Sequence, residues 1–308
     1  MYKPTVVVIA GPTASGKTSL GIELAKRING EIISADSMQI YKDMNIGTAK
    51  PTEDETKEIK HYLIDFVSPD CRYSVATFKK DAESCIEKIL TQGKMPIVVG
   101  GTGLYIDSLV YGIEYPEIEY DDEYRKKMMK LAETKSGLSE LYDEAKRIDK
   151  DAVEKISKND KKRIIRILEI YKSTGKTKTQ IDLLSRKNGL KYNYKVFAID
   201  MDRETLYNRI NQRVDKMIDM GLIDEVKNLI CQYDEFPTAM QGLGYKEVVE
   251  YLNKDISKED MIDKIKQETR RYAKRQLTWF RKNKNIIWID GQDNMNKNIS
   301  IIINELNT

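Results

Sequence analysis

Short apolar runs alternate with helix-like segments over the first third of the chain, and two more apolar runs follow near the C-terminus. The runs have the length of buried strands, and the segments between them have the 3.6-residue period of amphipathic helices. The predicted strands are residues 6–10, 31–35, 61–67, 96–99, 195–200 and 286–289, and the clearest early helices are residues 19–27 and 75–91. Because strands that alternate with helices form parallel sheets, the pattern predicts an α/β fold with a parallel sheet covered by helices.

The pattern changes between the two groups of strands. From residue 114 to residue 194 the chain is helical in period, highly charged and almost free of β-branched runs, and it opens with an acidic stretch over residues 114–123. A chain of 308 residues is long for one compact unit. We therefore predict an α/β core formed by residues 1–113 and 195–308, with an all-helical domain inserted at residues 114–194.

Composition narrows the class of protein. A hydrophobic content of 40% with 33% charged residues is typical of a globular protein, and no apolar run reaches the length of a membrane span. The first strand follows Met1 without a signal-peptide pattern. Cys71, Cys85 and Cys231 have neither disulfide nor metal-ligand spacing, which favours a reducing compartment. We expect a cytoplasmic protein without a membrane partner, and the net charge of +3 indicates no partner by itself.

A glycine-rich loop follows the first strand directly and leads into a helix, in the G-x-x-x-x-G-K-T pattern of phosphate-binding (P-loop) proteins. Its residues are Gly11, Pro12, Thr13, Ala14, Ser15, Gly16, Lys17 and Thr18. The two glycines allow amide groups to surround anionic oxygens, the helix N-terminus and Lys17 add positive charge, and the Thr18 hydroxyl suits Mg²⁺. The loop predicts a diphosphate or triphosphate ligand, and it does not distinguish ATP from other ligands of that kind.

Other polar residues follow the strands at the same edge of the sheet, where ligands of open α/β sheets bind. Asp36 and Ser37 come after the second strand, and Thr102 stands among glycines after the fourth. Asp36 has the position of a general base that faces a phosphate ester, with a Mg²⁺-water ligand or a helix cap as the alternatives. Asp65 and Asp200 also end predicted strands, so either is a candidate for the carboxylate on the metal side.

Four candidate residues can be interpreted in more than one way. Thr102 is either a reactive hydroxyl on a flexible backbone or part of an ordinary turn. Arg209 and Arg213, four residues apart on a predicted helix over residues 203–229, either clamp a diphosphate or carry surface charge. His61 is the only histidine, and its place at the start of a strand favours a structural role. General-base chemistry therefore falls to a carboxylate.

Two basic segments indicate a polyanionic partner. Around residues 159–166, Lys162, Arg163 and Arg166 can share one helix face, while Ile164, Leu168 and Tyr171 mark an apolar face. A long helix is also predicted over residues 257–284. Its apolar positions are Met261, Ile265, Tyr272, Gln276 with Leu277, and Phe280.

The second half of that long helix is dense in arginine and lysine with aromatic residues between them. From Asp263 to Lys284 there are nine basic and two acidic residues. A basic helix with interleaved aromatics is typical of nucleic-acid binding, and a solvated surface is the alternative for either segment.

The ordered set of motifs resembles the tRNA dimethylallyltransferase family, also called tRNA isopentenyltransferases, over nearly the full chain. The blocks that carry the resemblance lie at residues 11–18, 34–52, 98–112, 159–176, 209–226, 242–247 and 273–281. No Cys/His pair follows Ile286, so the bacterial type is the better match. Two positions depart from the family pattern, since Tyr62 stands beside His61 where two histidines are common, and Ile167 replaces an alanine.

The resemblance implies a prenyl transfer from dimethylallyl diphosphate to the exocyclic amine of the adenosine 3′ to the anticodon. Asp36 would accept the amine proton, and Thr102 would orient the adenine. Lys17, Arg213 and Thr18 with Mg²⁺ would stabilise the departing diphosphate, and Arg209 would help to bind it.

The resemblance also implies that the protein binds the tRNA anticodon stem-loop and flips the target base out of its stack. The implied tRNA-binding residues are Asp36, Ser37, Met38, Gln39, Thr102, Arg125, Lys162, Arg163, Arg166, Arg271, Lys274 and Arg275. We expect a monomer. Two rival classes stay open: a small-molecule kinase that binds ATP in the loop, and a non-catalytic RNA-binding NTPase.

Overall fold

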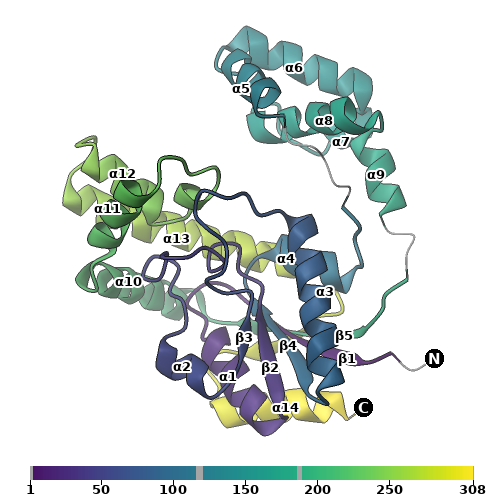
Figure 1. The fold of residues 1–308 in the computed structure, drawn as a ribbon, viewed down its shortest axis with the longest axis vertical. Coiled ribbons are helices and arrows are strands. Elements are labelled where there is room, and N and C mark those ends of the chain that lie inside the picture. The colour runs from purple at the N-terminus through teal and green to yellow at the C-terminus, as the bar shows by residue number, and fades with distance from the viewer. Residues whose placement is uncertain (1–2, 116–120, 186–188, 308) are drawn as a thin grey trace. The chain divides into compact units, whose positions relative to one another are not determined.

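A computed structural model of the protein describes residues 3–115, 121–185 and 189–307 (Figure 1). The chain forms two compact units. The first combines Met1–Val110 with Lys191–Thr308, and the second is Tyr111–Leu190. Part of the acidic stretch, residues 116–120, lies outside the described residues.

The first unit is built on a six-stranded, fully parallel sheet with the order β3-β2-β4-β1-β5-β6. Its strands are β1 (Thr5–Ala10), β2 (Gly30–Ser34), β3 (His61–Tyr62), β4 (Met95–Gly100), β5 (Asn193–Asp200) and β6 (Ile287–Asp290). The predicted α/β class with a parallel sheet is therefore confirmed. A parallel sheet brings all its carboxyl ends to one edge, so the segments after β1, β2 and β4 gather there.

Helices cover both faces of the sheet. The helices of this unit are α1 (Lys17–Arg27), α2 (Glu53–Lys57), α3 (Val75–Thr91), α4 (Gly103–Val110), α10 (Arg203–Asp219), α11 (Leu222–Gln232), the short 3₁₀ helix η1 (Ala239–Gln241), α12 (Tyr245–Leu252), α13 (Lys258–Phe280) and α14 (Met295–Leu306). Successive residues of β1 point to opposite faces. Val6 and Val8 pack with α3 and α4, and Val7 and Ile9 pack with α1 and α14.

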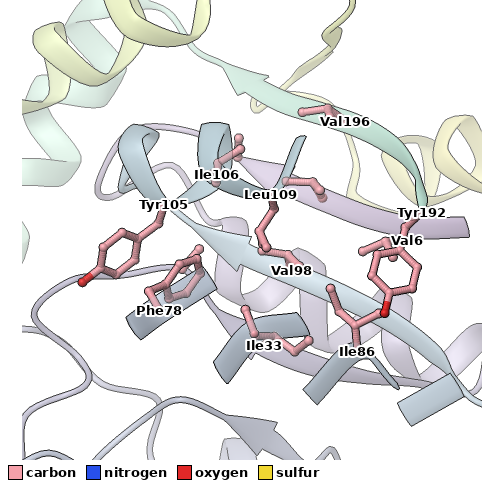
Figure 2. Packing of buried hydrophobic residues seen from close by; sticks show 14 of the residues in the cluster. Val6, Ile33, Phe78, Ile86, Val98, Tyr105, Ile106, Leu109, Tyr192 and Val196 are labelled. Atoms are coloured by element: carbon pink, nitrogen blue, oxygen red, sulfur yellow. The ribbon is translucent and has the colours of Figure 1, made fainter. Parts of the chain in front are cut away.

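Figure 2 shows the first of these two cores. Phe78 and Ile86 of α3, and Ile106 and Leu109 of α4, meet the sheet residues Val6, Ile33, Val98 and Val196, and all eight are buried. The Phe78 ring stacks on Tyr105 with 4.0 Å between centroids. Burial on both faces explains why the strands appear in the sequence as continuous apolar runs.

A third core lies beside the carboxyl edge of the sheet. Ile40, Tyr41 and Met44, in the loop after β2, pack against α11, α12 and α13. This packing fixes a loop that contributes to the site described below.

Three predicted elements differ from the structure. The strand predicted at residues 61–67 ends at Tyr62, because Leu63 and Asp65 adopt left-handed backbone angles (φ 59° and 58°) that a strand excludes. The helix predicted over residues 203–229 is two helices, separated at Gly221 with φ 96°. The last long helix ends at Phe280, earlier than residue 284.

The second unit is helical throughout its described residues. Its helices are α5 (Asp122–Leu131), α6 (Lys135–Ile148), α7 (Lys150–Val153), α8 (Lys161–Thr174) and α9 (Lys178–Leu184). Each begins at a side-chain cap, formed in turn by Asp121, Thr134, Asp149, Asp160 and Thr177. Its core includes Met128, Leu141, Ala145, Ile164 and Leu168. Across the described parts of both units, every helix is too short or too polar to cross a bilayer.

Candidate active site

A cavity of about 490 Å³ opens at the carboxyl ends of β1, β2 and β4 in the first unit. Three parts of the chain meet there: the phosphate-binding loop with α1, the segment after β2, and α10. The predicted site residues that line it are Thr13, Ala14, Gly16, Lys17, Thr18, Asp36, Gln39, Arg209 and Arg213. The phosphate-binding loop and Asp36 therefore converge on one crevice as the sheet topology predicted, whereas the third predicted segment, Gly101–Gly103, does not line it.

The phosphate-binding loop has the conformation that its glycines were expected to allow. Gly16 has φ 89°, in the left-handed region, and Ala14 shares that region with φ 62°. The Lys17 Nζ donates a hydrogen bond to the Pro12 carbonyl at 3.1 Å, which folds the side chain back over the loop. Helix α1 begins at Lys17, so its unpaired amide groups face the same region.

Two cations and one carboxylate lie close together in the cavity. Desolvation lowers the pKa of Lys17 to about 8; the charge of Asp36 raises it and that of Arg213 lowers it further. Burial also lowers the pKa of Arg213, against the opposing effect of Asp36. The Arg213 Nη1 reaches the Thr13 hydroxyl at 3.5 Å. Two desolvated cations held side by side repel each other, and an anionic ligand would relieve this repulsion.

Asp36 follows β2 and is held by the turn that it begins. Its Oδ1 accepts hydrogen bonds from the amide groups of Met38 at 2.9 Å and Gln39 at 3.4 Å. Both bonds go to one oxygen, so among the described residues Oδ2 is the oxygen available to a ligand. The carboxylate thus caps a turn, and the alternative of a helix cap is wrong, because the next helix begins only at Glu53.

Thr102 lies just behind this carboxylate. Its Oγ1 accepts a hydrogen bond from the Ser37 amide at 3.0 Å and donates to the Ser37 hydroxyl at 3.3 Å. Its own amide donates to the Ala35 carbonyl at 3.1 Å. Thr102 and Ser37 are therefore linked beside Asp36, although neither lines the cavity itself.

The glycines around Thr102 lie where neighbouring groups leave no room for a side chain. Gly100, Gly101 and Gly103 have no positive φ. A Cβ on Gly100 would lie 2.2 Å from the Ala35 carbonyl oxygen, and one on Gly103 would lie 2.4 Å from the Trp279 ring. Glycine is therefore required at Gly100 and Gly103 for the close approach of neighbouring groups to the backbone.

The other two strand-end carboxylates do not join Asp36. Asp65 lies in the loop after β3 and forms an ion pair with Lys50. Asp200 lines a separate cavity of about 700 Å³ and pairs with Arg281 at 3.3 Å. Asp36 is the only one of the three that lines the cavity of the phosphate-binding loop.

The cavity also contains residues that sequence reasoning did not place there, including Lys50, Gln212 and Lys216. His61 lines it too, and its Nδ1 contacts the Ile59 carbonyl at 2.7 Å. Burial lowers the pKa of His61, so the ring is neutral at pH 7, and its Nε2 has no partner among the described residues.

The sequence also did not reveal the role of Gln276. It is buried on α13 between the phosphate-binding loop and the segment that carries Thr102. In the sequence it appeared beside the apolar positions of the predicted helix and within the motif block at residues 273–281, and neither pattern assigned it a contact. No motif that depends on local spacing marks a contact of this kind, because its partners lie far away in the chain.

Some basic residues of the two predicted nucleic-acid-binding surfaces form ion pairs with acidic residues. On α13, Arg271 forms an ion pair with Glu268, whereas Lys274 and Arg275 are exposed. On α8 of the second unit, Lys162 is exposed and Arg163, with 67% of its side chain exposed, pairs with Asp160 at 3.3 Å.

The second unit also holds a buried charge cluster. Arg125 and Arg166 share the Glu169 carboxylate at 2.7 and 3.4 Å. Glu169 is buried, so these two arginines have a structural task besides any contact with a polyanion. Tyr171 is 42% exposed, so the predicted apolar face of α8 is shorter than expected.

Comparison with known proteins identifies the family. The model of the IPP transferase family matches residues 39–283. The chain belongs to the IPP transferase family. Among curated relatives, the tRNA dimethylallyltransferase of Acetivibrio thermocellus is 53% identical over 300 residues, which cover 97% of this chain and 95% of that one. The tRNA dimethylallyltransferase of Oceanobacillus iheyensis is 45% identical over 99% of this chain and 97% of its own.

Solved structures of the family share the fold. The tRNA delta(2)-isopentenylpyrophosphate transferase of Staphylococcus epidermidis superimposes with a TM-score of 0.71 at 42% identity, over 99% of both chains. A eukaryotic dimethylallyltransferase that acts on tRNA gives a TM-score of 0.75 at 32% identity, over 94% of this chain and 74% of that one. The predicted membership of the family is therefore confirmed.

Proposed function

We propose that the protein transfers the dimethylallyl group of dimethylallyl diphosphate to the N6 amine of the tRNA adenosine 3′-adjacent to the anticodon. The observation that carries the proposal is the cavity in which a phosphate-binding loop, the desolvated cations Lys17 and Arg213, and the Asp36 carboxylate meet. Membership of the IPP transferase family supports this reaction.

The diphosphate would lie against the phosphate-binding loop. Lys17 and Arg213 would offset the negative charge that grows on the diphosphate as its bond to the prenyl carbon breaks, and Arg209 would add a third cation at the cavity wall. Because Lys17 and Arg213 are already desolvated, their charges act at full strength without a reorganisation of solvent, whereas Arg209 is exposed.

The donor set of the cavity fits Mg²⁺. Among the described residues, no three acidic, histidine or cysteine side chains lie close enough to form a metal site alone. Thr18 and Asp36 line the same cavity, and one hydroxyl with one carboxylate beside diphosphate oxygens is typical of Mg²⁺ bound to a polyphosphate. Thr18 would hold the ion, which when bound would supply positive charge to the leaving group.

Asp36 would accept the proton of the adenosine amine. Hydrogen bonds from Met38 and Gln39 orient its carboxylate through Oδ1, and Oδ2 remains for the amine. Thr102 would position the base through the Ser37 contacts that it makes beside Asp36. Met38 and Gln39, on the same turn, would contact the flipped nucleotide.

The tRNA would be gripped by basic residues of both units. We assign Lys274 and Arg275 on α13 and Lys162 and Arg163 on α8 to phosphate contacts, because these four are exposed. Arg125, Arg166 and Arg271 would contribute positive charge while they keep their glutamate partners.

The test incubates the purified protein with unmodified tRNA, Mg²⁺ and radiolabelled dimethylallyl diphosphate, with labelled ATP in a parallel reaction. The proposal expects label from the prenyl donor in the anticodon loop, on N6 of the adenosine, with release of one diphosphate. Phosphate transfer or hydrolysis from ATP without any prenyl transfer would overturn the proposal in favour of a kinase or an NTPase.

A further inference from the structure

The side chain of Gln276 joins two halves of the candidate site that lie far apart in the chain. Its Oε1 accepts a hydrogen bond from the Thr13 amide at 2.9 Å, and its Nε2 donates to the Gly101 carbonyl at 2.8 Å. The first contact spans 263 positions of sequence and the second spans 175. The residue is 6% exposed, so water cannot easily replace either bond.

Little free space surrounds the side-chain amide of Gln276. A Cβ on Gly101 would lie 2.3 Å from the Gln276 Nε2 and 3.2 Å from the Gly11 carbonyl oxygen. Thr13 requires an acceptor and Gly101 requires a donor, and a carboxamide supplies both in one planar group. A carboxylate of the same shape would face the Gly101 carbonyl with no proton to donate.

Further contacts link Thr13 to the proposed diphosphate side of the cavity and Gly101 to the proposed adenosine side. On one side, the Thr13 hydroxyl accepts from Arg213, which faces the predicted diphosphate site. On the other side, Thr102 follows Gly101 directly and bonds to Ser37, the neighbour of Asp36. The amide of Gln276 is therefore the direct bridge between the loop that binds the leaving group and the segment that positions the acceptor.

We infer that Gln276 is a positioning residue that sets the distance between the prenyl carbon and the adenosine amine, and thereby excludes water as the acceptor. This inference rests on the proposed function. When the bond between the prenyl carbon and the diphosphate oxygen breaks, the bonding electrons leave with the diphosphate. The carbon then takes an electron pair from the amine nitrogen, whose proton passes to Asp36.

If the bridge is loosened, water competes for the same carbon. The water oxygen then forms the new carbon–oxygen bond, its proton goes to solvent, and the products are dimethylallyl alcohol and diphosphate. The ratio of prenyl alcohol to prenylated tRNA thus measures the geometry that Gln276 is inferred to maintain. A residue needed only for folding would not change this ratio in the folded fraction.

The experiment compares the full-length wild-type protein with Gln276→Glu, which keeps the shape and the acceptor but removes the donor. A second variant, Gly101→Ala, adds a methyl group that would displace the Gln276 side-chain amide without removing it. The control is Gln292→Glu, because Gln292 is exposed at the separate cavity and touches the Thr205 hydroxyl. Diphosphate release, tRNA prenylation and alcohol formation are measured together, with thermal unfolding as the check of folding.

Both test variants should lose transfer by about tenfold or more in kcat and raise the share of alcohol, while KM for each substrate changes by less than about threefold. The control should match the wild type. A folded Gln276→Glu variant with wild-type kcat and wild-type alcohol share would overturn the inference. If that variant does not fold, Gly101→Ala decides by the same criterion. Failure of the wild type to prenylate tRNA would instead refute the proposed function.

Discussion

The carboxylate of Glu225 accepts a hydrogen bond from the Ile46 amide at 2.7 Å, which ties α11 to the loop that follows β2. The same carboxylate also accepts from the amides of Asn45 at 2.9 Å and Gly47 at 3.1 Å, and from the Tyr245 hydroxyl at 2.6 Å. One side chain thus satisfies three consecutive amide groups of a loop whose next residues line the cavity.

Replacing Glu225 with glutamine should therefore lower the free energy of unfolding by about 1–3 kcal/mol, because one acceptor oxygen becomes a donor that faces amide groups. The matched control is Asp224→Asn on the same helix, whose side chain is 75% exposed and pairs only at the surface with Lys227. Chemical denaturation measures both. Equal stability of the two variants would show that the Glu225 contacts contribute nothing to the fold.

The lowered pKa of Lys17 predicts a pH dependence of diphosphate binding. The ammonium is charged below about pH 8 and loses its proton as the pH rises through that value. The dissociation constant of inorganic diphosphate should increase above pH 8, by up to about tenfold per pH unit where the lysine is mostly neutral. Calorimetric titrations at several pH values between 7 and 9.5 measure this change.

The control for that pH dependence is Lys17→Arg, since a guanidinium stays charged over the whole range. Its dissociation constant should vary less with pH than that of the wild type. A wild-type profile that is flat across pH 8 would contradict the assigned pKa.

Removal of the Asp36 carboxylate should slow the chemistry and spare binding. We expect Asp36→Asn to lower kcat by a factor on the order of 10²–10⁴, as is typical for loss of a general base, with tRNA affinity within a few-fold of the wild type. Single-turnover prenylation and filter binding separate the two effects. Unchanged turnover would remove Asp36 from the role of base.

The basic face of α8 should contribute through salt-dependent contacts. The double variant Lys162→Gln with Arg163→Gln should weaken tRNA binding and make the plot of log affinity against log salt about 1–2 units less steep. Arg166→Gln should also lower stability, because Arg166 helps to neutralise the buried Glu169. An unaltered salt slope in the double variant would assign this face to solvent.

The glycine after β4 gives a prediction about packing. Gly100→Ala places a methyl group 2.2 Å from the Ala35 carbonyl oxygen, so it should cost about 1–3 kcal/mol of stability through overpacking. Gly189→Ala is the control, because among the described residues no atom beyond its chain neighbours lies within 4 Å of its added Cβ. Comparable melting temperatures for the two variants would contradict the close approach.

Local patterns predicted the elements of the first unit well where the signal was continuous. The apolar runs of β1, β2 and β4 and the helix over residues 75–91 were predicted within one or two residues, because burial on both faces leaves an uninterrupted pattern. The third strand was predicted too long, since the left-handed angle at Leu63 is set by the tertiary fold and leaves no trace in hydrophobicity.

Some residues of the candidate site could likewise be predicted from the sequence, and others could not. Lys17, Asp36 and Arg213 were found because motif spacing and the order of the strands place them at one edge of the sheet. Gln276 and Glu225 lie in the motif blocks at residues 273–281 and 209–226, but the motifs did not reveal their contacts, because their hydrogen-bond partners lie far away in the chain. Tertiary hydrogen bonds of this kind require coordinates.

The bridge from Thr13 to Gln276 also bears on how the protein is made. The phosphate-binding loop leaves the ribosome well before the Gln276 amide that completes it, which emerges 263 positions after Thr13. A nascent chain can form β1, β2 and β4 with their helices, but its two substrate sides stay unjoined until α13 is released. We therefore expect the acceptor geometry to form only after α13 has been synthesised, and chains truncated before α13 to retain a phosphate-binding loop without a positioned partner.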